Sequence, residues 1–393
     1  MKKLFRISTI PMSLNLLLKG QLRYLNQFYE VTVISGAGSD LEEVREREGV
    51  KVEAIEMSRE ISILKDLVAL FQLYRFFKKE KPDIVHSITP KAGLLTMMAA
   101  RLAGVPVRMH TFTGLIFPYK KGLLKFILIW MDRLLASSAT HVYPEGKGVK
   151  EDLERYRISR KPLKILAHGN VNGIDTSYFN PETIAESDQE NLRLQLGLSE
   201  EDFVFIFVGR LVRDKGINEL VTAFKNLNVI ARRHDEATPT PHNLKLLLVG
   251  PFEQELDPLE AATLKEIETN PHIISVGFQT EVRPYFALSD ALVFPSYREG
   301  FPNVVLQSLA MELPAIVTDI NGCNEIITPG ENGLIIPVKN AEVLQAAMEA
   351  LYTDTSLYQS LKNNTRKSIF LYEQKAVWEA LLEEYRLVNG VNV

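Results

Sequence analysis

Short apolar runs alternate with stretches of helical periodicity along the whole chain. In the first half, the runs that predict strands are Leu4–Ile7, Val31–Ser35, Val52–Ile55, Asp83–Ser87, Val107–Thr111, His141–Tyr143 and Leu163–Leu166. In the second half they are Phe203–Val208, Leu244–Val249, Ile273–Val276, Ala291–Phe294, Ala315–Thr318 and Leu334–Pro337. Helical periodicity fills the gaps, most clearly from Ile61 to Lys79. Several runs are apolar on successive residues, which is typical of parallel strands buried on both faces between helices.

This repeat predicts two doubly wound α/β domains. The polar segment 180–199 separates the two halves, so we expect domains over 1–185 and 186–365. The final stretch, 366–393, is either a plain last helix of the second domain or a helix that crosses back to the first. A second polar insert, 232–243, contains two prolines and is typical of an exposed loop. Ligands of such sheets bind outside the carboxyl ends of the strands, so the expected site is a cleft between two facing domains.

Composition and charge narrow the class of protein. Lys and Arg number 45 and Asp and Glu 49, a net charge of −4 among 393 residues, so no global basic field favours nucleic acid. The single cysteine, Cys323, excludes a disulfide-stapled domain and a cysteine-based zinc site. The first apolar run is broken by Ser8, Thr9 and Pro11, which favours a buried strand over a signal peptide. With no run of about 18 apolar residues, we expect a cytoplasmic protein that could still lie on the inner face of the cell membrane.

Two common phosphate motifs are absent, namely GxGxxG after either first strand and GxxxxGK[ST] anywhere. The segment VGRLVRDKG follows the first strand of the second half instead. Gly209 permits a tight turn, Arg210 and Lys215 are two cations in one loop, and Gly216 opens a helix whose amino terminus favours an anion. This pattern suits a departing diphosphate, and it equally suits a solvated basic turn.

The second candidate segment is SYREGFPNVVLQSLAMELP, after the strand Ala291–Phe294. We expect a loop at the carboxyl end of that strand, followed by a helix from about Val304. Backbone amides in the loop can bind an anion, and Glu299 can accept hydrogen bonds from sugar hydroxyls. The residues that could reach a ligand are Glu299, Gly300, Phe301, Pro302, Asn303 and Gln307. Taken alone, the segment also fits a helix cap with an incidental acid.

Taken together and in order, VGRLVRDKG and the segment 276–337 resemble the nucleotide-sugar half of retaining glycosyltransferases of family 4, which have the GT-B architecture. The first half adds KPDIVHSITPKAGLLTMMAARLAGVPVRMHTFTG and NVNGIDTSYFNP. These segments are similar to the subgroup that builds capsule, O-antigen and other surface polysaccharides.

The resemblance implies roles for particular residues. Arg210 and Lys215 would bind the donor diphosphate, and Glu299 would position the donor sugar. The remaining donor residues would be Gly209, Gly277, Phe278, Gly300, Phe301, Pro302, Asn303 and Gln307. Retention would proceed by front-face attack, with the leaving phosphate taking the proton of the acceptor. The resemblance implies no cofactor and no metal, because the nucleotide-sugar is a co-substrate and the chain has no Asp-x-Asp triplet.

Gln307 and Thr113 depart from the family pattern. Gln307 stands where the E-x7-E motif has its second glutamate, so we expect altered or weaker ribose recognition, because an amide lacks the charge of a carboxylate. Thr113 and Gly114 replace the usual His-Gly pair, and threonine cannot act as a general base. His110 and His86 are then the candidate bases, although each also fits a structural histidine.

The acceptor side departs as well. Ser13 and Asn15 stand where many relatives have a Gly-Gly pair, which leaves the acceptor uncertain.

The segment 118–136 combines apolar and basic residues. Leu123, Ile127, Trp130 and Leu134 share a helical face beside several lysines. This combination suits an interfacial helix on anionic lipid, and a buried helix is the alternative.

The sequence therefore predicts a hexosyl- or N-acetylhexosaminyltransferase. It would move a sugar from a nucleotide-sugar, most simply a UDP-sugar, to a glycan or polyprenyl-diphosphate-linked acceptor. A GT-B epimerase or phosphorylase is an alternative within enzymes. A catalytically weak sugar-nucleotide-binding subunit is the alternative outside them, and Gln307 and Thr113 are its best support.

Overall fold

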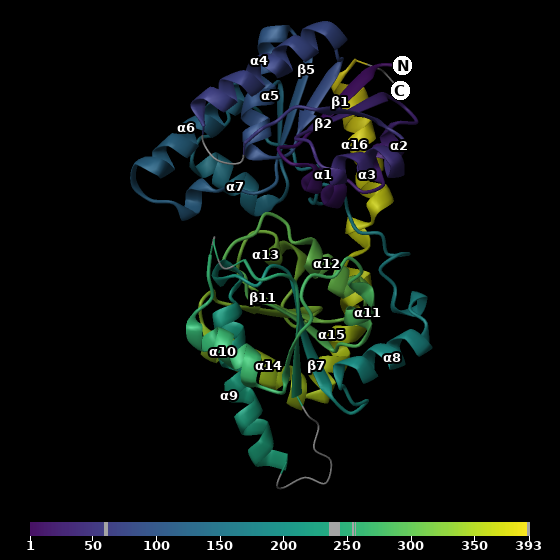
Figure 1. The fold of residues 1–393 in the computed structure, drawn as a ribbon, viewed down its shortest axis with the longest axis vertical. Coiled ribbons are helices and arrows are strands. Elements are labelled where there is room, and N and C mark those ends of the chain that lie inside the picture. Colours follow the sequence, from purple (N-terminus) through teal and green to yellow (C-terminus); the bar gives the residue numbers. More distant parts are fainter. Residues whose placement is uncertain (59–61, 236–243, 254, 256, 391–393) are drawn as a thin grey trace. The chain divides into compact units, whose positions relative to one another are not determined.

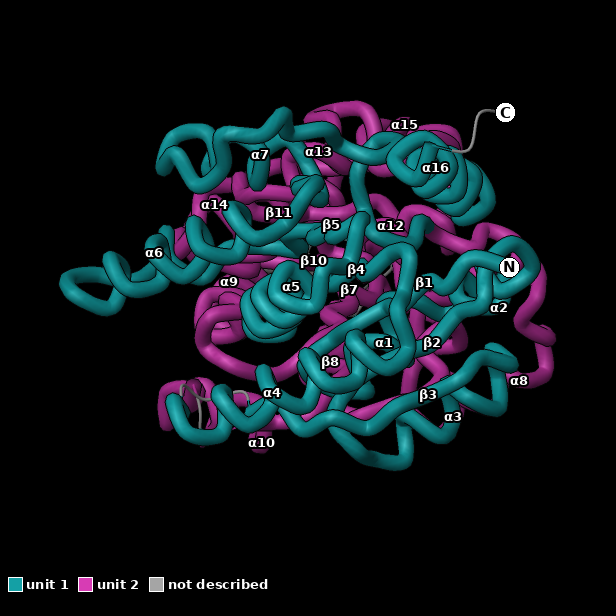
Figure 2. Tube along the Cα trace, turned by 90° about the horizontal axis from the view of Figure 1, so that it is seen from above, with its two compact units in different colours: residues 1–173, 374–393 teal, residues 174–373 magenta. Residues whose placement is uncertain are grey.

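A computed structural model describes residues 1–58, 62–235, 244–253, 255 and 257–390. The chain divides into two compact units. The first comprises 1–173 and 374–393, and the second comprises 174–373; Figure 2 colours them separately. The sequence placed the boundaries at 185 and 365, whereas the chain passes between units at 173 and 373.

The first unit is built on a six-stranded parallel sheet in the order β3-β2-β1-β4-β5-β6. Its strands are β1 (Lys3–Ile7), β2 (Glu30–Ser35), β3 (Lys51–Ala54), β4 (Ile84–Ser87), β5 (Val107–Phe112) and β6 (His141–Pro144). The strand order reverses between β1 and β4, as in a doubly wound fold.

Helices cover both faces of this sheet. Buried apolar side chains of α1 (Pro11–Leu17), α2 (Gln21–Leu25) and α3 (Ser39–Glu48) pack on one face. Those of α4 (Ile63–Glu80), α5 (Pro90–Ala103), α6 (Gly122–Ser138) and α7 (Lys147–Arg155) pack on the other. A short 3-10 helix, η1 (Phe117–Tyr119), precedes α6.

The final helix, α16 (Gln374–Val388), belongs to the first unit. It is drawn in yellow in Figure 1 and lies beside α2 and the first strands. Leu381, Leu382 and Tyr385 join the same apolar cluster as Leu4 of β1. The sequence left open whether the last helix stays with the second domain, and its side chains pack on the first sheet.

The second unit has its own six-stranded parallel sheet, in the order β12-β11-β10-β7-β8-β9. Its strands are β7 (Phe203–Val208), β8 (Leu244–Val249), β9 (Ile273–Ser275), β10 (Ala291–Phe294), β11 (Ala315–Thr318) and β12 (Gly333–Ile336). The order reverses between β7 and β10, because β7 pairs with β8 on one side and β10 on the other.

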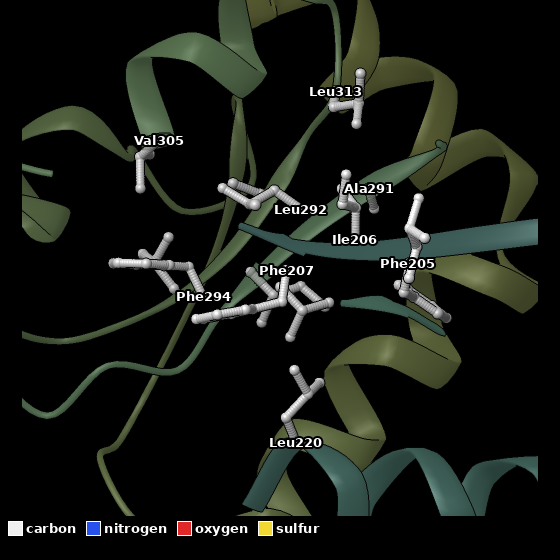
Figure 3. Packing of buried hydrophobic residues seen from close by; sticks show 14 of the residues in the cluster. Phe205, Ile206, Phe207, Leu220, Ala291, Leu292, Phe294, Val305 and Leu313 are labelled. Atoms are coloured by element: carbon white, nitrogen blue, oxygen red, sulfur yellow. The ribbon is translucent and has the colours of Figure 1, made fainter. Parts of the chain in front are cut away.

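The helices of this unit pack around a single large apolar cluster. They are α8 (Glu186–Leu196), α9 (Ile217–Asp235), α10 (Ala261–Thr269), α11 (Arg283–Ala287), α12 (Asn303–Ala310), α13 (Cys323–Ile326), α14 (Ala341–Thr353) and α15 (Thr355–Ser368). Three 3-10 turns, η2 (Pro181–Thr183), η3 (Arg213–Lys215) and η4 (Phe370–Tyr372), complete the described elements. Figure 3 shows part of the cluster, in which Phe207 of β7 stacks on Phe294 of β10, with ring centroids 5.9 Å apart. This packing fixes the two strands whose carboxyl ends carry the candidate motifs.

Three expectations about local structure need correction. Residues 163–166 form no strand, and only a single bridge joins Leu163 to Val142. The expected linker 180–199 contains η2 and α8, and α8 has no buried residue. Within the expected loop 232–243, residues 232–235 continue α9, and 236–243 lie outside the described residues.

Helix α6 leaves much of its apolar surface exposed. The exposed fractions are 74% for Leu123, 63% for Phe126 and 58% for Trp130. The alternative of a buried helix is therefore wrong for the first half of α6. Within the described part of the chain, no helix is both long and apolar enough to cross a bilayer.

The second half of α6 turns inward and carries an acid with it. Asp132 is largely shielded from solvent, and this burial raises the pKa of its carboxyl from an ordinary 3.8 to about 7. Between these two values the unfolded chain ionises Asp132 while the folded chain keeps it protonated. Folding stability therefore falls as the pH rises from about 4 to 7. Above pH 7 the folded protein bears the full free-energy cost of an ionised carboxylate in this buried site.

We predict that Asp132→Asn stabilises the protein at pH 8 by up to about 4 kcal/mol and has little effect near pH 4. Urea unfolding at the two pH values measures this difference. Glu151→Gln, at an exposed acid of the first unit, serves as the control and should leave stability nearly unchanged at both. Equal effects of Asp132→Asn at both pH values would contradict the prediction.

Candidate functional site

The two motifs singled out in the sequence meet at the carboxyl ends of β7 and β10. These strands are neighbours at the reversal point of the second sheet. The segment 209–216 follows β7 and leads into α9, and the segment 295–302 follows β10 and leads into α12. In doubly wound sheets this edge, at the reversal point, is where ligands bind.

Glycine permits the close approach of these two loops. Gly216 has φ +73°, and a Cβ added there would overlap the carbonyl oxygen of Pro295. Gly250, at the end of β8, meets the carbonyl oxygen of Gly209 in the same way. Any side chain at Gly216 would therefore push the β7–α9 loop away from the β10–α12 loop.

The approach brings Lys215 and Glu299 into an ion pair between Nζ and Oε1. Both side chains are only 16% exposed. The Ser296 hydroxyl donates to the same Oε1 at 2.7 Å, and the Lys215 ammonium lies 5.6 Å from the centre of the Phe294 ring. The described residues make no hydrogen bond to Oε2 of Glu299, so this oxygen remains available to a ligand.

Arg210 lies in the same loop but has a different partner. Its guanidinium Nη1 donates to Oε2 of Glu253 at 2.6 Å, and its side chain is about half exposed. The structure thus brings Lys215 and Glu299 into contact, while Arg210 pairs with Glu253.

The loop before α12 is held from two sides. Phe301 is buried against Tyr372, with ring centroids 5.4 Å apart, so its side chain belongs to the core. Gly322 packs so closely that a Cβ there would overlap the carbonyl oxygen of Gly300. Pro302 is the N-cap residue and α12 begins at Asn303, one residue before the predicted start.

Two more donor-side candidates lie in the loop after β9. The carbonyl of Gly277 accepts a hydrogen bond from the amide of Gly250 at 2.8 Å. The side chain of Phe278 is 68% exposed. Gln307 lies in the second turn of α12 and is half-buried.

The acceptor-side candidates lie in the first unit and are largely engaged in its structure. Asn15 is buried on α1, where its amide donates to Asp40 at 2.8 Å and to Glu43 at 2.9 Å on α3. Ser13 is half-buried on the same helix.

Thr113 and Gly114 lie in the turn after β5. The Thr113 hydroxyl donates to the carbonyl of Ile88 at 2.9 Å, and Gly114 has φ +131°.

His86 lies in a buried polar cluster under α16. Arg6 of β1 donates from Nη1 to the hydroxyl of Tyr385 at 2.6 Å. That hydroxyl lies 2.6 Å from Nδ1 of His86, and Nε2 of His86 lies 2.8 Å from the hydroxyl of Thr111. Since a hydroxyl that accepts from Arg6 has its hydrogen free for Nδ1, we assign the proton of His86 to Nε2. Burial, followed by the charge of Arg6, holds the pKa of His86 well below its usual range.

The cavity beside this cluster is small. It measures about 30 Å³ and is lined by Arg6, His86 and Glu145 among others, which is room for about two water molecules.

His110 is buried on the opposite face of the sheet. Its Nδ1 lies 2.8 Å from the hydroxyl of Ser87, and its ring packs edge-on against Phe112 at 4.5 Å. Burial lowers the pKa of His110 to about 3. Both histidines therefore have the surroundings of structural residues.

Sequence reasoning missed Ser296, Arg6 and Tyr385. Ser296 is fully buried, and Thr318 of β11 donates to its carbonyl oxygen. Its position in SYREGFP was a signal, because a small hydroxyl directly after a buried strand can reach a neighbouring acid. Arg6 was visible as a charge inside an apolar strand, but its partner Tyr385 is 379 residues away. Among the described residues, no group of three or more His, Cys, Asp or Glu could hold a metal ion.

Comparisons with known families match both units. Residues 20–169 match the model of the glycosyl transferase 4-like domain, and residues 188–368 match that of glycosyl transferases group 1.

Curated relatives extend these matches over nearly the whole chain. The chain is 30% identical over 314 residues to the Escherichia coli UDP-Gal:alpha-D-GlcNAc-diphosphoundecaprenol alpha-1,3-galactosyltransferase, covering 80% of this chain and 77% of that protein. It is 29% identical over 387 residues to the capsular polysaccharide biosynthesis glycosyltransferase CapM of Staphylococcus aureus, covering 98% and 97%.

A solved structure shares the fold. Anabaena HepE in complex with UDP and glucose superposes with a TM-score of 0.79 at 17% identity, covering 98% of this chain and 100% of that one.

Proposed function

The chain belongs to glycosyltransferase family 4 and has its GT-B fold, and on this premise we propose that it transfers a sugar, with retention, from a nucleoside-diphosphate sugar to a polyprenyl-diphosphate-linked acceptor. The observation that carries the proposal is the group formed by Lys215, Glu299 and Ser296 at the reversal point of the second sheet. It combines a cation for a diphosphate with a fixed carboxylate for sugar hydroxyls.

The donor half of the proposal rests on charge. Breaking the bond between a sugar and a diphosphate leaves the electron pair on phosphate oxygen. The ammonium of Lys215 lies on the last residue before the glycine that opens α9, so side-chain charge and helix amides can stabilise that oxygen together. Arg210 supplies a second cation when its guanidinium leaves Glu253 and binds the diphosphate of the donor. These groups suffice to neutralise the diphosphate, so we propose catalysis without a metal.

The roles of Glu299 and the acceptor follow from the same arrangement. Oε1 of Glu299 is held by Lys215 and Ser296, which leaves Oε2 to accept a hydroxyl of the donor sugar. The acceptor oxygen would then bond to the anomeric carbon on the face that the phosphate leaves. Its proton passes to the departing phosphate oxygen, so Glu299 acts as a positioning group and not as a nucleophile.

The acceptor class is supported by relatives of this chain. The Escherichia coli relative is named for a UDP-galactose donor and an undecaprenol diphosphate acceptor, and the Staphylococcus aureus relative for capsular polysaccharide biosynthesis. We propose a UDP-sugar and a lipid-linked glycan for this chain.

We predict that Lys215→Ala and Glu299→Gln each lower kcat by about 100-fold or more, because each removes a group that acts on developing charge or sugar position. The assay is nucleotide release with a panel of UDP-sugars and a lipid-linked acceptor. Lys225→Gln on α9, where Lys225 pairs with Glu266 at 2.6 Å, is the matched control and should retain activity. Full activity of Lys215→Ala would contradict the proposed site.

The amide at position 307 gives a second test. If Gln307 contacts the ribose of the donor, Gln307→Glu adds a charge-assisted hydrogen bond, and we predict a fall in donor KM of about 3- to 10-fold. Steady-state kinetics at saturating acceptor measure the donor KM. Gln307→Ala removes the hydrogen-bonding group and should raise that KM. An unchanged KM in both variants would remove Gln307 from the donor site.

We further propose that α6 contacts an anionic membrane surface. Its first half exposes Leu123, Phe126 and Trp130, and Lys120 and Lys121 lie exposed just before it. Basic residues next to exposed aromatic and aliphatic side chains are the pattern of an interfacial helix. Such contact would bring the first unit to a lipid-linked acceptor.

We predict that Leu123→Ser combined with Phe126→Ser reduces co-sedimentation with vesicles containing anionic phospholipid by about 5-fold or more. Each substitution removes apolar side-chain area that the membrane would otherwise bury. The change leaves nucleotide release with a water-soluble acceptor analogue intact. Leu194→Ser on α8, where the side chain is 79% exposed, is the control. Equal vesicle binding by wild type and the α6 variant would contradict membrane contact through this helix.

A further inference from the structure

We propose that Asp214 and Arg298 are positioning residues that keep the loop of Lys215 in register with the loop of Glu299 while the donor is bound. The inference rests on the proposed function of Lys215 and Glu299. Its physical basis is a second ion pair beside the first. In the first pair the β7–α9 loop supplies the cation, and in the second pair it supplies the carboxylate.

The two pairs run between the same two loops. Asp214 directly precedes Lys215, and Arg298 directly precedes Glu299. Arg298 donates from Nη2 to Oδ2 of Asp214 at 2.6 Å, while Lys215 pairs with Glu299. Each loop therefore gives one cation and one carboxylate, and two adjacent cross-links join them.

The backbone reinforces the second cross-link. The amide of Tyr297 donates to the carbonyl of Asp214 at 2.8 Å. The amide of Asp214 donates to Oδ2 of Asp257 at 2.6 Å. Asp214 thus uses its amide, its carbonyl and its carboxylate to fix the β7–α9 loop, and two of these three groups bind the β10–α12 loop.

A second cross-link matters because the first must open. A donor diphosphate competes with Glu299 for the ammonium of Lys215, so binding weakens the Lys215–Glu299 pair. Arg298 and Asp214 would then keep the two loops together and Glu299 beside the sugar. The same pair adds little to overall stability, because its side chains are 44% and 23% exposed and exposed pairs contribute little. Its removal should therefore affect turnover more than folding.

The kinetic test uses Arg298→Gln, Asp214→Asn and the double variant, with Lys225→Gln as control. Each single change should lower kcat by about 10- to 100-fold, the range expected when a positioned group shifts by about 1 Å. The donor KM should stay within about 3-fold of the wild-type value. The kcat of the double variant should be no lower than that of the less active single variant, because both substitutions break the same ion pair. Arg298→Lys should restore part of the activity.

Two kinetic results would overturn the proposal. Multiplying effects in the double variant would mean that the two residues act separately. A rise in donor KM with kcat intact in Arg298→Gln alone would make Arg298 a direct ligand of the donor.

Hydrogen exchange tests the cross-link without any donor. In Arg298→Gln and Asp214→Asn, the amide of Tyr297 should exchange about 5-fold faster or more, because its acceptor loop loosens, and in Lys225→Gln it should not change. Unchanged exchange in all variants would overturn the cross-link itself. Faster exchange in a protein that transfers no sugar from any donor would instead leave the cross-link standing and reject the proposed function.

Discussion

The approach of Gly216 to the carbonyl of Pro295 is the constraint on which the candidate site depends. A glycine at φ +73° allows the loop after β7 to touch the loop after β10. Lys215 and Glu299, which are 84 residues apart in the chain, then form an ion pair that is mostly shielded from solvent. Beneath it, the stacking of Phe207 on Phe294 fixes the two strands from which the loops emerge. Packing in the sheet thus sets the geometry that the chemistry uses.

The first unit also depends on contacts between segments that are far apart in the chain. The hydroxyl of Tyr385 on α16 bridges Arg6 and His86, because it lies 2.6 Å from Nη1 of Arg6 and 2.6 Å from Nδ1 of His86. This bridge explains how a buried arginine is tolerated in a central strand, since its charge is partly satisfied by hydrogen bonds. It also explains why His86 has the surroundings of a structural residue. The final helix is consequently part of the hydrophobic core of the first unit.

The strands could be predicted from the sequence because both faces of the sheets are buried, so apolar residues follow one another without alternation. The prediction failed at Leu163–Leu166, where Lys164 turns out to pair with Glu384 of α16 and only one bridge forms. It also failed at α8, because its apolar residues Leu192 and Leu196 pack on the cluster while only partly buried, and the polar residues around them are typical of a linker.

Lys215 and Glu299 could be found as motif residues, but their pairing and the support from Ser296 could not, because these depend on contacts between segments far apart in the chain. The roles of His86 and His110 were open for the same reason, since burial on the two sides of a sheet is invisible to local sequence.

The most direct measurement of the central claim is a crystal structure of the protein with a uridine diphosphate. We expect the phosphate oxygens to lie within hydrogen-bond distance of Nζ of Lys215 and of amides between Gly300 and Asn303, while Ser296 keeps its hydrogen bond to Glu299. A diphosphate bound elsewhere, with the Lys215–Glu299 pair undisturbed, would contradict it.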